Sequence, residues 1–263
     1  QPSELEDFLD EDGLRSRRSN LRRLTQDTDD EQVFLPEEEA IPLLEKSPVT
    51  GGYRMPWGSN YTFLVRLEAG EGKYLQAIYK PRDGERPLYD YPNGTLYLRE
   101  RATFVLSQAL GWPSIPHTLV REGPYGVGSM QLYIDCDPNI TYFDLFEKRE
   151  EEFLKFALFD VVVNNGDRKA GHCIIGEDER LWSIDHGLTF HTIFKLRTVM
   201  LEYWGKPIPE PLVDDLKGLM QRLRSSSDSL TIHLSTLIDT TEIQALMQRL
   251  DALIKEPTLP VMD

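Results

Sequence analysis

The sequence predicts an α+β protein: a smaller, β-rich N-terminal part over about residues 41–137, followed by a larger, mainly helical part over about residues 138–263. Two observations predict this class. Between residues 43 and 135, apolar residues alternate with polar ones and Gly and Pro interrupt the runs, which is typical of strands and turns. After residue 139, apolar residues recur at intervals of three and four, which is typical of helices.

An antiparallel sheet with one helix is predicted for the N-terminal part. Two runs alternate about a turn that contains two glycines, as in a hairpin, and an apolar face lies between a Thr and a Gly, as in a capped helix. The predicted elements are a hairpin over residues 61–81 with its turn at 69–72, a helix over 95–110, and a strand over 129–136 that ends at Asp137 and Pro138.

Three helices and a short hairpin are predicted for the C-terminal part. The first helix is apolar almost all round, as expected of a helix buried on most sides, and the last follows a capping box formed by Asp239 and Glu242. The predicted helices span residues 151–165, 211–224 and 240–255, and the hairpin spans 173–184, with residues 225–227 as a loop.

The composition bounds the class of protein. With 263 residues, 40% of them hydrophobic, the chain can bury a sizeable core. It has no run of about 18 apolar residues, and its N-terminus is acidic where a secretory signal would be basic and then apolar, so we expect neither membrane insertion nor signal-directed export. Cys136 and Cys173 are too few for a disulfide framework, so we expect a cytoplasmic protein. Since the first residue is Gln1, a removed leader stays an open alternative.

The formal net charge is −15, and residues 1–40 supply −8 of it through 13 acidic and 5 basic residues. This sign repels phosphate backbones and anionic headgroups at long range, so we expect no nucleic-acid partner. Low hydrophobicity with high charge predicts that residues 1–40 form a disordered acidic tail, with one short helix near residues 5–24.

The stretch 164–187, NNGDRKAGHCIIGEDERLWSIDHG, carries the candidate chemistry. Asp167, Lys169 and His172 lie in a loop after the buried helix, and Asp185 follows the hairpin. Phosphoryl transfer needs a carboxylate that accepts the proton of an attacking hydroxyl, cations for the phosphoryl oxygens, and an acidic group that holds a metal. Because the hairpin returns the chain to its start, we expect these four side chains at one centre.

A lysine for the remaining phosphates, held by a carboxylate, completes this chemistry. Lys80 ends the predicted hairpin, and Glu100 lies on the following helix outside its apolar face. Arg168 and Asp160 suit either of two roles, contact with substrate or support of the loop.

Residues 166–187 resemble the catalytic loop, hairpin and metal-binding loop of the protein-kinase-like superfamily. Asp167, Lys169 and His172 match the offsets of Asp-x-Lys-x-x-Asn, and residues 185–187 match Asp-Phe-Gly. FDVVVNNGDR with IDHGLTF resembles the lipid-kinase-like branch, which includes type II phosphatidylinositol 4-kinases and HipA-type kinases. The segments MPWGSNYTFLVRL, AIYKPRDGERPL and LRE are also similar to a bacterial phosphatidylinositol 3- and 4-kinase-like family, over about residues 43–215.

The resemblance implies a two-lobed kinase-like fold, with a small antiparallel N-lobe and a helical C-lobe, that binds ATP with Mg²⁺ or Mn²⁺. It makes Asp167 the catalytic base, Lys169 a contact to the transferring phosphate, Asp185 and His172 the metal ligands, and Lys80 with Glu100 the ion pair on the nucleotide phosphates. It also makes Gly58, Ser59 and Asn60 the loop over the phosphates and puts Ile134 at the adenine.

The implied activity is that of a kinase that moves the γ-phosphate of ATP to a hydroxyl of a lipid headgroup, protein or small molecule. The charge of −15 argues against docking on an anionic membrane. One departure matters: related kinases have Asn where this chain has His172, and imidazole favours Mn²⁺ or Zn²⁺ over Mg²⁺.

Three alternatives stay open. A nucleotide-binding pseudokinase would explain His172, and a metal-dependent hydrolase would use Asp167, His172 and Asp185. A structural zinc site would use His172, Cys173, His186 and His191, although their spacing matches no regular zinc pattern.

Overall fold

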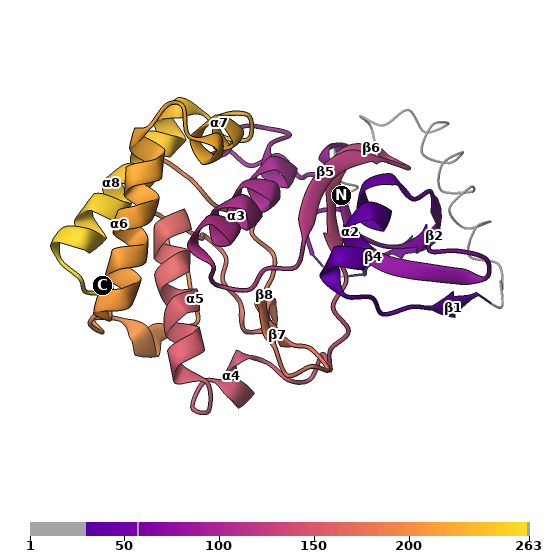
Figure 1. Ribbon diagram of the computed structural model, residues 1–263, viewed down its shortest axis with the longest axis horizontal. Helices are drawn as coiled ribbons and strands as arrows, with labels where there is room; N and C mark the ends of the chain where they lie inside the picture. The colour runs from indigo at the N-terminus through magenta and orange to yellow at the C-terminus, as the bar shows by residue number, and fades with distance from the viewer. Residues whose placement is uncertain (1–29, 57, 262–263) are drawn as a thin grey trace. The chain divides into compact units, whose positions relative to one another are not determined.

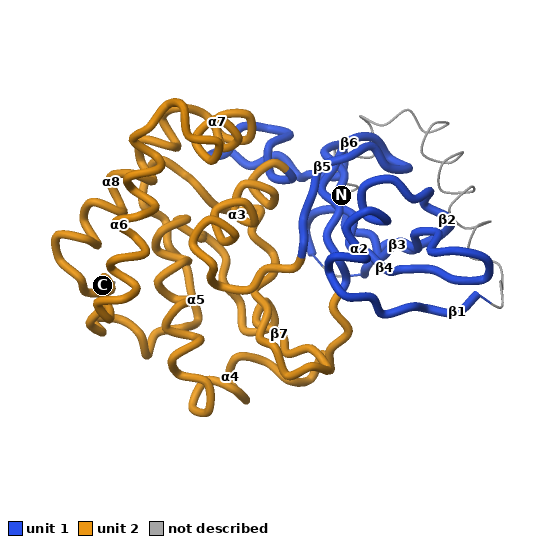
Figure 2. The backbone as a smooth tube through the Cα atoms, viewed as in Figure 1, with its two compact units in different colours: residues 1–97, 117–133 blue, residues 98–116, 134–263 orange. Residues whose placement is uncertain are grey.

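The computed structural model describes residues 30–56 and 58–261 (Figure 1). Two compact units divide the chain: the first holds the residues up to 97 and residues 117–133, and the second holds residues 98–116 and those from 134 onward (Figure 2). The first unit is built on an antiparallel sheet and the second is mainly helical, which confirms the predicted α+β class. The helix expected near residues 5–24 lies outside the described residues.

The sheet of the first unit has the order β2-β3-β4-β6-β5, and all pairs along this path are antiparallel. Its strands are β2 (Val49–Arg54), β3 (Phe63–Glu68), β4 (Lys73–Pro81), β5 (Thr118–Gly123) and β6 (Gly126–Leu132). β3 and β4 form the hairpin predicted over residues 61–81, and the amide of Ala69 donates to the carbonyl of Lys73 across its turn at 3.0 Å.

One strand of this sheet differs from the prediction. β6 ends at Leu132, not near residue 136. The amide of Tyr133 still donates to the carbonyl of Gln76 in β4, and the chain then leaves the sheet and enters the second unit at residue 134. The partner of β6, β5, is an additional strand. The glycines at 126 and 128 hide the start of β6 from an alternation pattern. Gly128 is required because a Cβ there would lie 2.4 Å from the carbonyl oxygen of Lys80.

Residues 31–40 are structured, so the predicted disordered tail was wrong for this part. β1 (Glu31–Gln32) pairs in parallel with β4, and α2 (Glu37–Lys46) buries Ala40 and Leu44. The run of glutamates from residue 37 occupies the first turn of α2, where negative charge is favourable to the helix dipole. These three glutamates, which contributed to the prediction of disorder, therefore belong to the start of a helix.

Helices dominate the second unit, and α5, α6 and α8 lie side by side (Figure 1). The helices are α3 (Leu96–Leu110), whose first two residues belong to the first unit, α4 (Tyr142–Leu145), α5 (Glu150–Val163), α6 (Glu210–Arg224), α7 (Ser229–Ser235) and α8 (Thr240–Lys255). The three helices predicted here correspond to α5, α6 and α8, while α4 and α7 are additional. No described helix has the length and apolarity needed to cross a membrane.

The core of the second unit is organised around α5, of which nine residues are buried. The predicted capping box of α8 is present: the Asp239 carboxylate accepts from the amide of Glu242, and the Glu242 carboxylate accepts from the amide of Asp239. The other carboxylate oxygen of Glu242 pairs with buried Arg99 of α3, whose guanidinium also donates to the carbonyl of Thr189. This buried pair ties two helices to the segment that follows Asp185.

Candidate functional site

The loop that carries Asp167 begins where α5 ends, at Asn164, whose φ of 54° lies in the left-handed region. The side chain of Asn164 donates to the carbonyls of His191 and Ile193 at 2.9 and 2.8 Å and accepts from the amide of Lys195 at 2.7 Å. An asparagine suits this position because it tolerates a positive φ and offers both donors and an acceptor. The end of the helix therefore fixes the later segment 191–195 as well.

Arg168 is the structural centre of the loop. Its buried guanidinium makes a bidentate ion pair with Asp160 of α5, at 2.7 and 2.8 Å. It also donates to the carbonyls of His172 and Ile184, at 3.1 and 3.2 Å, which lie on either side of the hairpin. Burial opposes the charge, but the Asp160 carboxylate outweighs it and raises the pKa of Arg168. Arg168 and Asp160 thus support the loop, which decides between the two roles left open by the sequence.

Asp167 and Lys169, on either side of Arg168, form an ion pair with each other. Lys169 Nζ lies 2.8 Å from Asp167 Oδ2, and the side chains are 62% and 33% exposed respectively. The amide of Asp167 donates to the side-chain oxygen of Asn165 at 3.0 Å, which fixes the backbone beneath the carboxylate. Both groups are accessible to a reactant, while the residue between them is buried.

The predicted hairpin brings Asp185 back to this loop. β7 (Cys173–Ile175) and β8 (Leu181–Ser183) are antiparallel, and the amide of Ile184 donates to the carbonyl of His172 at 3.0 Å. Asp185 has a φ of 62°, an uncommon conformation for a non-glycine residue that often marks functional sites. Its Oδ2 lies 3.1 Å from His172 Nε2.

The hydrogen bond at Nδ1 of His172 determines which nitrogen of the neutral ring carries the proton. Nδ1 accepts from the amide of Lys169 at 3.3 Å, so in the neutral ring the proton resides on Nε2 and is donated to Asp185. A nitrogen that carries a proton has no lone pair for a metal. In this arrangement His172 orients Asp185, and its role as a metal ligand, which stays a prediction, requires the ring to change its tautomer.

Glu100 lies behind the same turn. This buried residue of α3 accepts from the amide of His186 at 3.0 Å, so it anchors the backbone next to Asp185. Its ion pair with Lys80, a residue of the first unit, stays a prediction.

Two of the four residues of the zinc alternative are in surroundings that do not favour a metal. The Nε2 atom of His186 lies 3.1 Å from the Arg168 guanidinium and 2.9 Å from Ser183 Oγ. Burial raises the pKa of the Cys173 thiol to about 12, which opposes the thiolate that zinc needs. Within residues 30–56 and 58–261, no three His, Cys, Asp or Glu side chains are grouped so that they could hold a metal ion.

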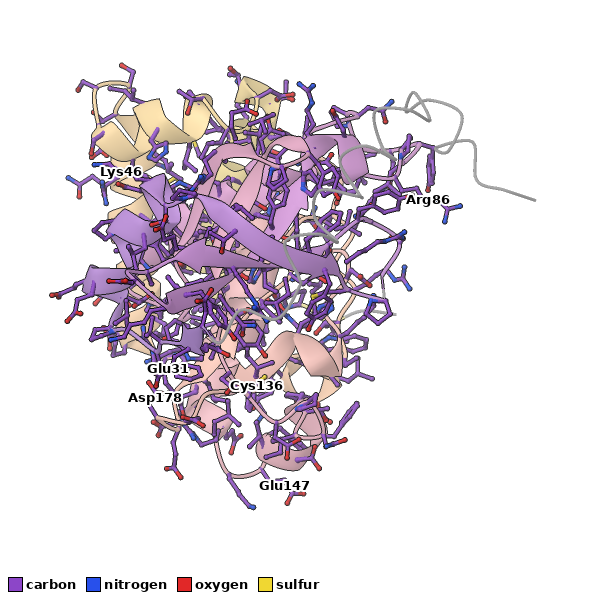
Figure 3. All side chains as sticks on the ribbon, turned by 90° about the vertical axis from the view of Figure 1, so that its right-hand side faces the viewer. Glu31, Lys46, Arg86, Cys136, Glu147 and Asp178 are labelled. Carbon is purple, nitrogen blue, oxygen red and sulfur yellow. The ribbon has the colours of Figure 1, made fainter. Side chains whose placement is uncertain are left out.

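The candidate residues of the first unit lie on β4 and in the connection between β2 and β3. Lys80 is half-buried and stands opposite Ser129 of β6. Gly58 and Ser59 are exposed. The side-chain oxygen of Asn60 accepts from the amide of Arg86 at 2.7 Å, so it holds the loop after β4, from which the Arg86 side chain extends outward (Figure 3).

Ile134 begins the second segment of the second unit. It is half-buried, and its Cγ2 lies 3.3 Å from the position that a Cβ on Gly176 would take. It therefore packs against the turn of the β7–β8 hairpin. Contact of Ile134 with an adenine stays a prediction.

Sequence reasoning missed the segment that lines the other side of the Asp167 loop. The amide of Arg168 donates to the carbonyl of Arg197 at 2.9 Å, and the amide of Arg197 donates to the carbonyl of Asn165 at 3.0 Å. This pairing is parallel, with Thr198 opposite Arg168. A parallel contact between segments 30 residues apart has no local pattern that could have revealed it.

Comparison with known protein sequences identifies two relatives of this chain. No family model matches the chain. Protein Rv2133c of Mycobacterium tuberculosis is 36% identical over 242 residues, which cover 79% of this chain and 86% of the mycobacterial protein. Phosphatidylinositol 4-kinase gamma 4 of Oryza sativa subsp. japonica is 27% identical over 183 residues, 56% of this chain and 32% of the rice protein.

Among solved structures, the Golgi casein kinase with Mn and ADP bound is similar to this chain, with a TM-score of 0.58 and 15% sequence identity. The match covers 97% of this chain and 91% of the other. At this identity the likeness shows the fold alone, and that fold is protein-kinase-like, as the resemblance implied.

Proposed function

The chain belongs to the family of Protein Rv2133c from Mycobacterium tuberculosis, and on that premise we propose that it is an ATP-dependent phosphotransferase that acts on a hydroxyl. One observation carries the proposal. A loop and a hairpin, held together by buried Arg168, present Asp167 with Lys169 and, next to them, Asp185 with His172. The kinase-like fold and the rice relative, a phosphatidylinositol 4-kinase by name, support the reaction class.

Asp167 is the proposed base, because its carboxylate is accessible and its backbone is fixed by Asn165. It would orient the acceptor hydroxyl and take its proton as the new bond to phosphorus forms. Lys169 would contact the transferring phosphoryl group and offset the charge on its oxygens. The Lys169–Asp167 ion pair is largely exposed and therefore weak, so the lysine can exchange the carboxylate for a phosphate at little cost.

Asp185 is the proposed metal ligand. Mg²⁺ is commonly held by one or two carboxylates together with substrate phosphates and water, so a site with a single accessible carboxylate fits a metal that arrives with ATP. Such an ion would neutralise phosphate charge when bound. His172 would hold the Asp185 carboxylate in position. A direct bond from its ring to the metal is the alternative, and it would require a change of tautomer.

The nucleotide-binding residues are proposed from the resemblance and from their places in the two units. Lys80 would contact phosphates and pair with Glu100, while Gly58 and Ser59 would cover the phosphates through backbone amides. Asn60 would contribute its backbone alone, since its side-chain oxygen is bound to the Arg86 amide. Ile134 would lie against the adenine.

A nucleotide-binding module without turnover is the second candidate. The hydrogen bond that His172 makes to Asp185, where related kinases have a carboxamide, favours it. A metal-dependent hydrolase has less support, because it would leave Lys80 without a role and would need further protein ligands to the metal.

The test is ATP binding by calorimetry and ADP release with Mg²⁺ and with Mn²⁺. We expect Asp167→Asn to bind ATP and lose turnover, and Asp185→Asn to lose metal-dependent ATP binding. Asp214→Asn, which changes an exposed carboxylate on α6, is the matched control and is expected to behave as the native chain. Absence of ATP binding with either metal would refute the kinase proposal, whereas binding without turnover on any acceptor would favour the second candidate.

A further inference from the structure

Arg197 lies beside the proposed base through a backbone pairing. Its segment runs parallel to the Asp167 loop, and two hydrogen bonds of Arg168 fix the register: its amide donates to the carbonyl of Arg197 at 2.9 Å, and its carbonyl accepts from the amide of Val199 at 3.2 Å. Residue 198 is therefore opposite residue 168, and residue 197 is beside residue 167.

The direction of the side chains follows from this register. Successive side chains of extended backbone point to opposite faces, and paired residues share a face. The Arg168 side chain points into the protein, where it is fully buried. Asp167 and Lys169 consequently share the outer face with Arg197, which is exposed.

The guanidinium of Arg197 is available on this face. Among the described residues, no carboxylate lies within 4.0 Å of it. Residues 191–201, HTIFKLRTVML, contain Lys195 and Arg197 but neither Asp nor Glu. In a chain of net charge −15, this is a local reversal of sign next to the proposed base.

The reversal favours a small anion over an extended one. At physiological ionic strength, charges are screened over about 8 Å, so a small molecule at this face interacts mainly with the nearby cations. A membrane or an acidic protein would extend over the negative remainder of the surface and be repelled. A neutral acceptor would need no cation here. An anionic acceptor is repelled by Asp167 and by the γ-phosphate of ATP, so it needs a nearby cation in order to bind.

We propose that Arg197 binds a phosphate group of the acceptor, so that the acceptor is a small polyol phosphate; this rests on the function proposed above. Arginine presents two parallel N–H donors that match two phosphate oxygens. In the reaction, a free hydroxyl of the polyol attacks the γ-phosphorus of ATP, the bond from that phosphorus to the bridging oxygen of ADP breaks, and the hydroxyl proton passes to Asp167. The products are ADP and a polyol that carries one further phosphate.

The experiment measures phosphate transfer from labelled ATP, with Mg²⁺ and with Mn²⁺, to three matched pairs: glycerol and glycerol 3-phosphate, glucose and glucose 6-phosphate, inositol and inositol 1-phosphate. Vesicles of phosphatidylcholine with phosphatidylinositol test the lipid-borne form of the same chemistry, and a serine peptide rich in Asp and Glu tests a protein acceptor. Calorimetry with ATP on the same sample reports nucleotide binding separately.

We expect transfer to at least one phosphorylated polyol and less to its neutral parent. Arg197→Ala should raise the KM for that acceptor about 10- to 100-fold, because a hydrogen-bonded charge is lost, and Arg197→Lys should restore part of it. Arg224→Ala, which removes another exposed arginine of the second unit, should leave the KM unchanged. Preference for vesicles over inositol 1-phosphate would contradict the proposal, because a membrane surface is expected to be repelled by the negative remainder of the protein.

Three further results would overturn the proposal while leaving the kinase function intact: ATP binding without transfer to any polyol phosphate, equal transfer to the neutral parents or to the acidic peptide, or an unchanged KM in Arg197→Ala. Failure of the native chain to bind ATP would instead remove the proposed function, and this inference with it.

Discussion

His172 Nε2 lies 3.1 Å from Asp185 Oδ2, and the other nitrogen of the same ring accepts a hydrogen bond from the Lys169 amide. The imidazole thus connects the residue before β7 to the residue that follows the hairpin, and it orients the Asp185 carboxylate, which we propose as the metal ligand. A donor that orients a metal ligand typically affects metal affinity or activity about 10- to 100-fold. The position at which the chain departs from related kinases is therefore a structural link as well as a candidate ligand.

Two substitutions separate these roles. We expect His172→Ala to lower metal-dependent turnover about 10-fold or more, because Asp185 loses its orienting donor. We expect His172→Asn to leave the ratio of Mg²⁺- to Mn²⁺-supported activity unchanged, because Nε2 carries a proton and is bound to Asp185. Initial rates in the two metals give the ratio, and a marked gain of Mg²⁺ activity in His172→Asn would identify His172 as a metal ligand.

Removal of Arg168 should affect stability more than any surface arginine. Arg168→Met leaves the Asp160 carboxylate buried without its ion pair, which costs about 3–5 kcal/mol, and also frees the carbonyls of His172 and Ile184. Urea denaturation measures the free energy of unfolding. Arg222→Met breaks the more exposed pair with Asp228 and should cost about 1 kcal/mol or less.

The double variant Arg168→Met with Asp160→Leu extends this test. Replacing both partners of a buried pair by apolar residues is often near neutral for stability, so we expect much of the lost free energy to return. Turnover should stay low, because no guanidinium holds the two sides of the hairpin. Recovery of turnover together with stability would show that Arg168 does not position the site.

Local elements of the fold were more predictable from the sequence than contacts between distant segments. Local patterns were sufficient for the hairpin over residues 61–81 and for the capping box at Asp239, since alternation and capping depend on neighbouring residues. The contact between the Asp167 loop and residues 197–199 depends on backbone hydrogen bonds, which no side-chain pattern encodes. The strand at Gly126–Leu132 was misplaced because its glycines carry no apolar signal.

Acid should weaken the start of α8. Hydrogen bonds from the Thr241 side chain and the Glu242 amide lower the pKa of Asp239. Since the folded-state pKa is below the unfolded value of about 3.9, the contribution of the cap is complete above that pH and is lost as the pH falls through the folded-state pKa.

Asp239→Ala provides the measurement. We expect it to lower the free energy of unfolding by about 1 kcal/mol at pH 7, the usual contribution of a helix cap, and by less at pH 3. Unfolding by urea at both pH values gives the difference. Asp251→Ala, on the same helix with an exposed ion pair to Lys255, is the control. An equal loss at both pH values would mean that the charge of Asp239 does not contribute.

Gly128 should be indispensable for the strand that carries Lys80. A Cβ at residue 128 would lie 2.4 Å from the carbonyl oxygen of Lys80 and 2.7 Å from the Cα of Pro81, and both are backbone atoms. Gly128→Ala therefore forces β4 and β6 apart, which we expect to cost about 1–3 kcal/mol or more and to weaken ATP binding by displacing Lys80. Thermal unfolding and calorimetry with ATP measure the two effects.

A second glycine gives the control. Gly218 is exposed within α6, and a Cβ there meets no atom within 4 Å, so Gly218→Ala should raise the free energy of unfolding by about 0.5–1 kcal/mol through helix propensity. ATP affinity should not change. If Gly128→Ala lowers stability but leaves ATP affinity at the native value, the backbone of β4 does not determine where Lys80 acts, and its assignment to the nucleotide phosphates fails.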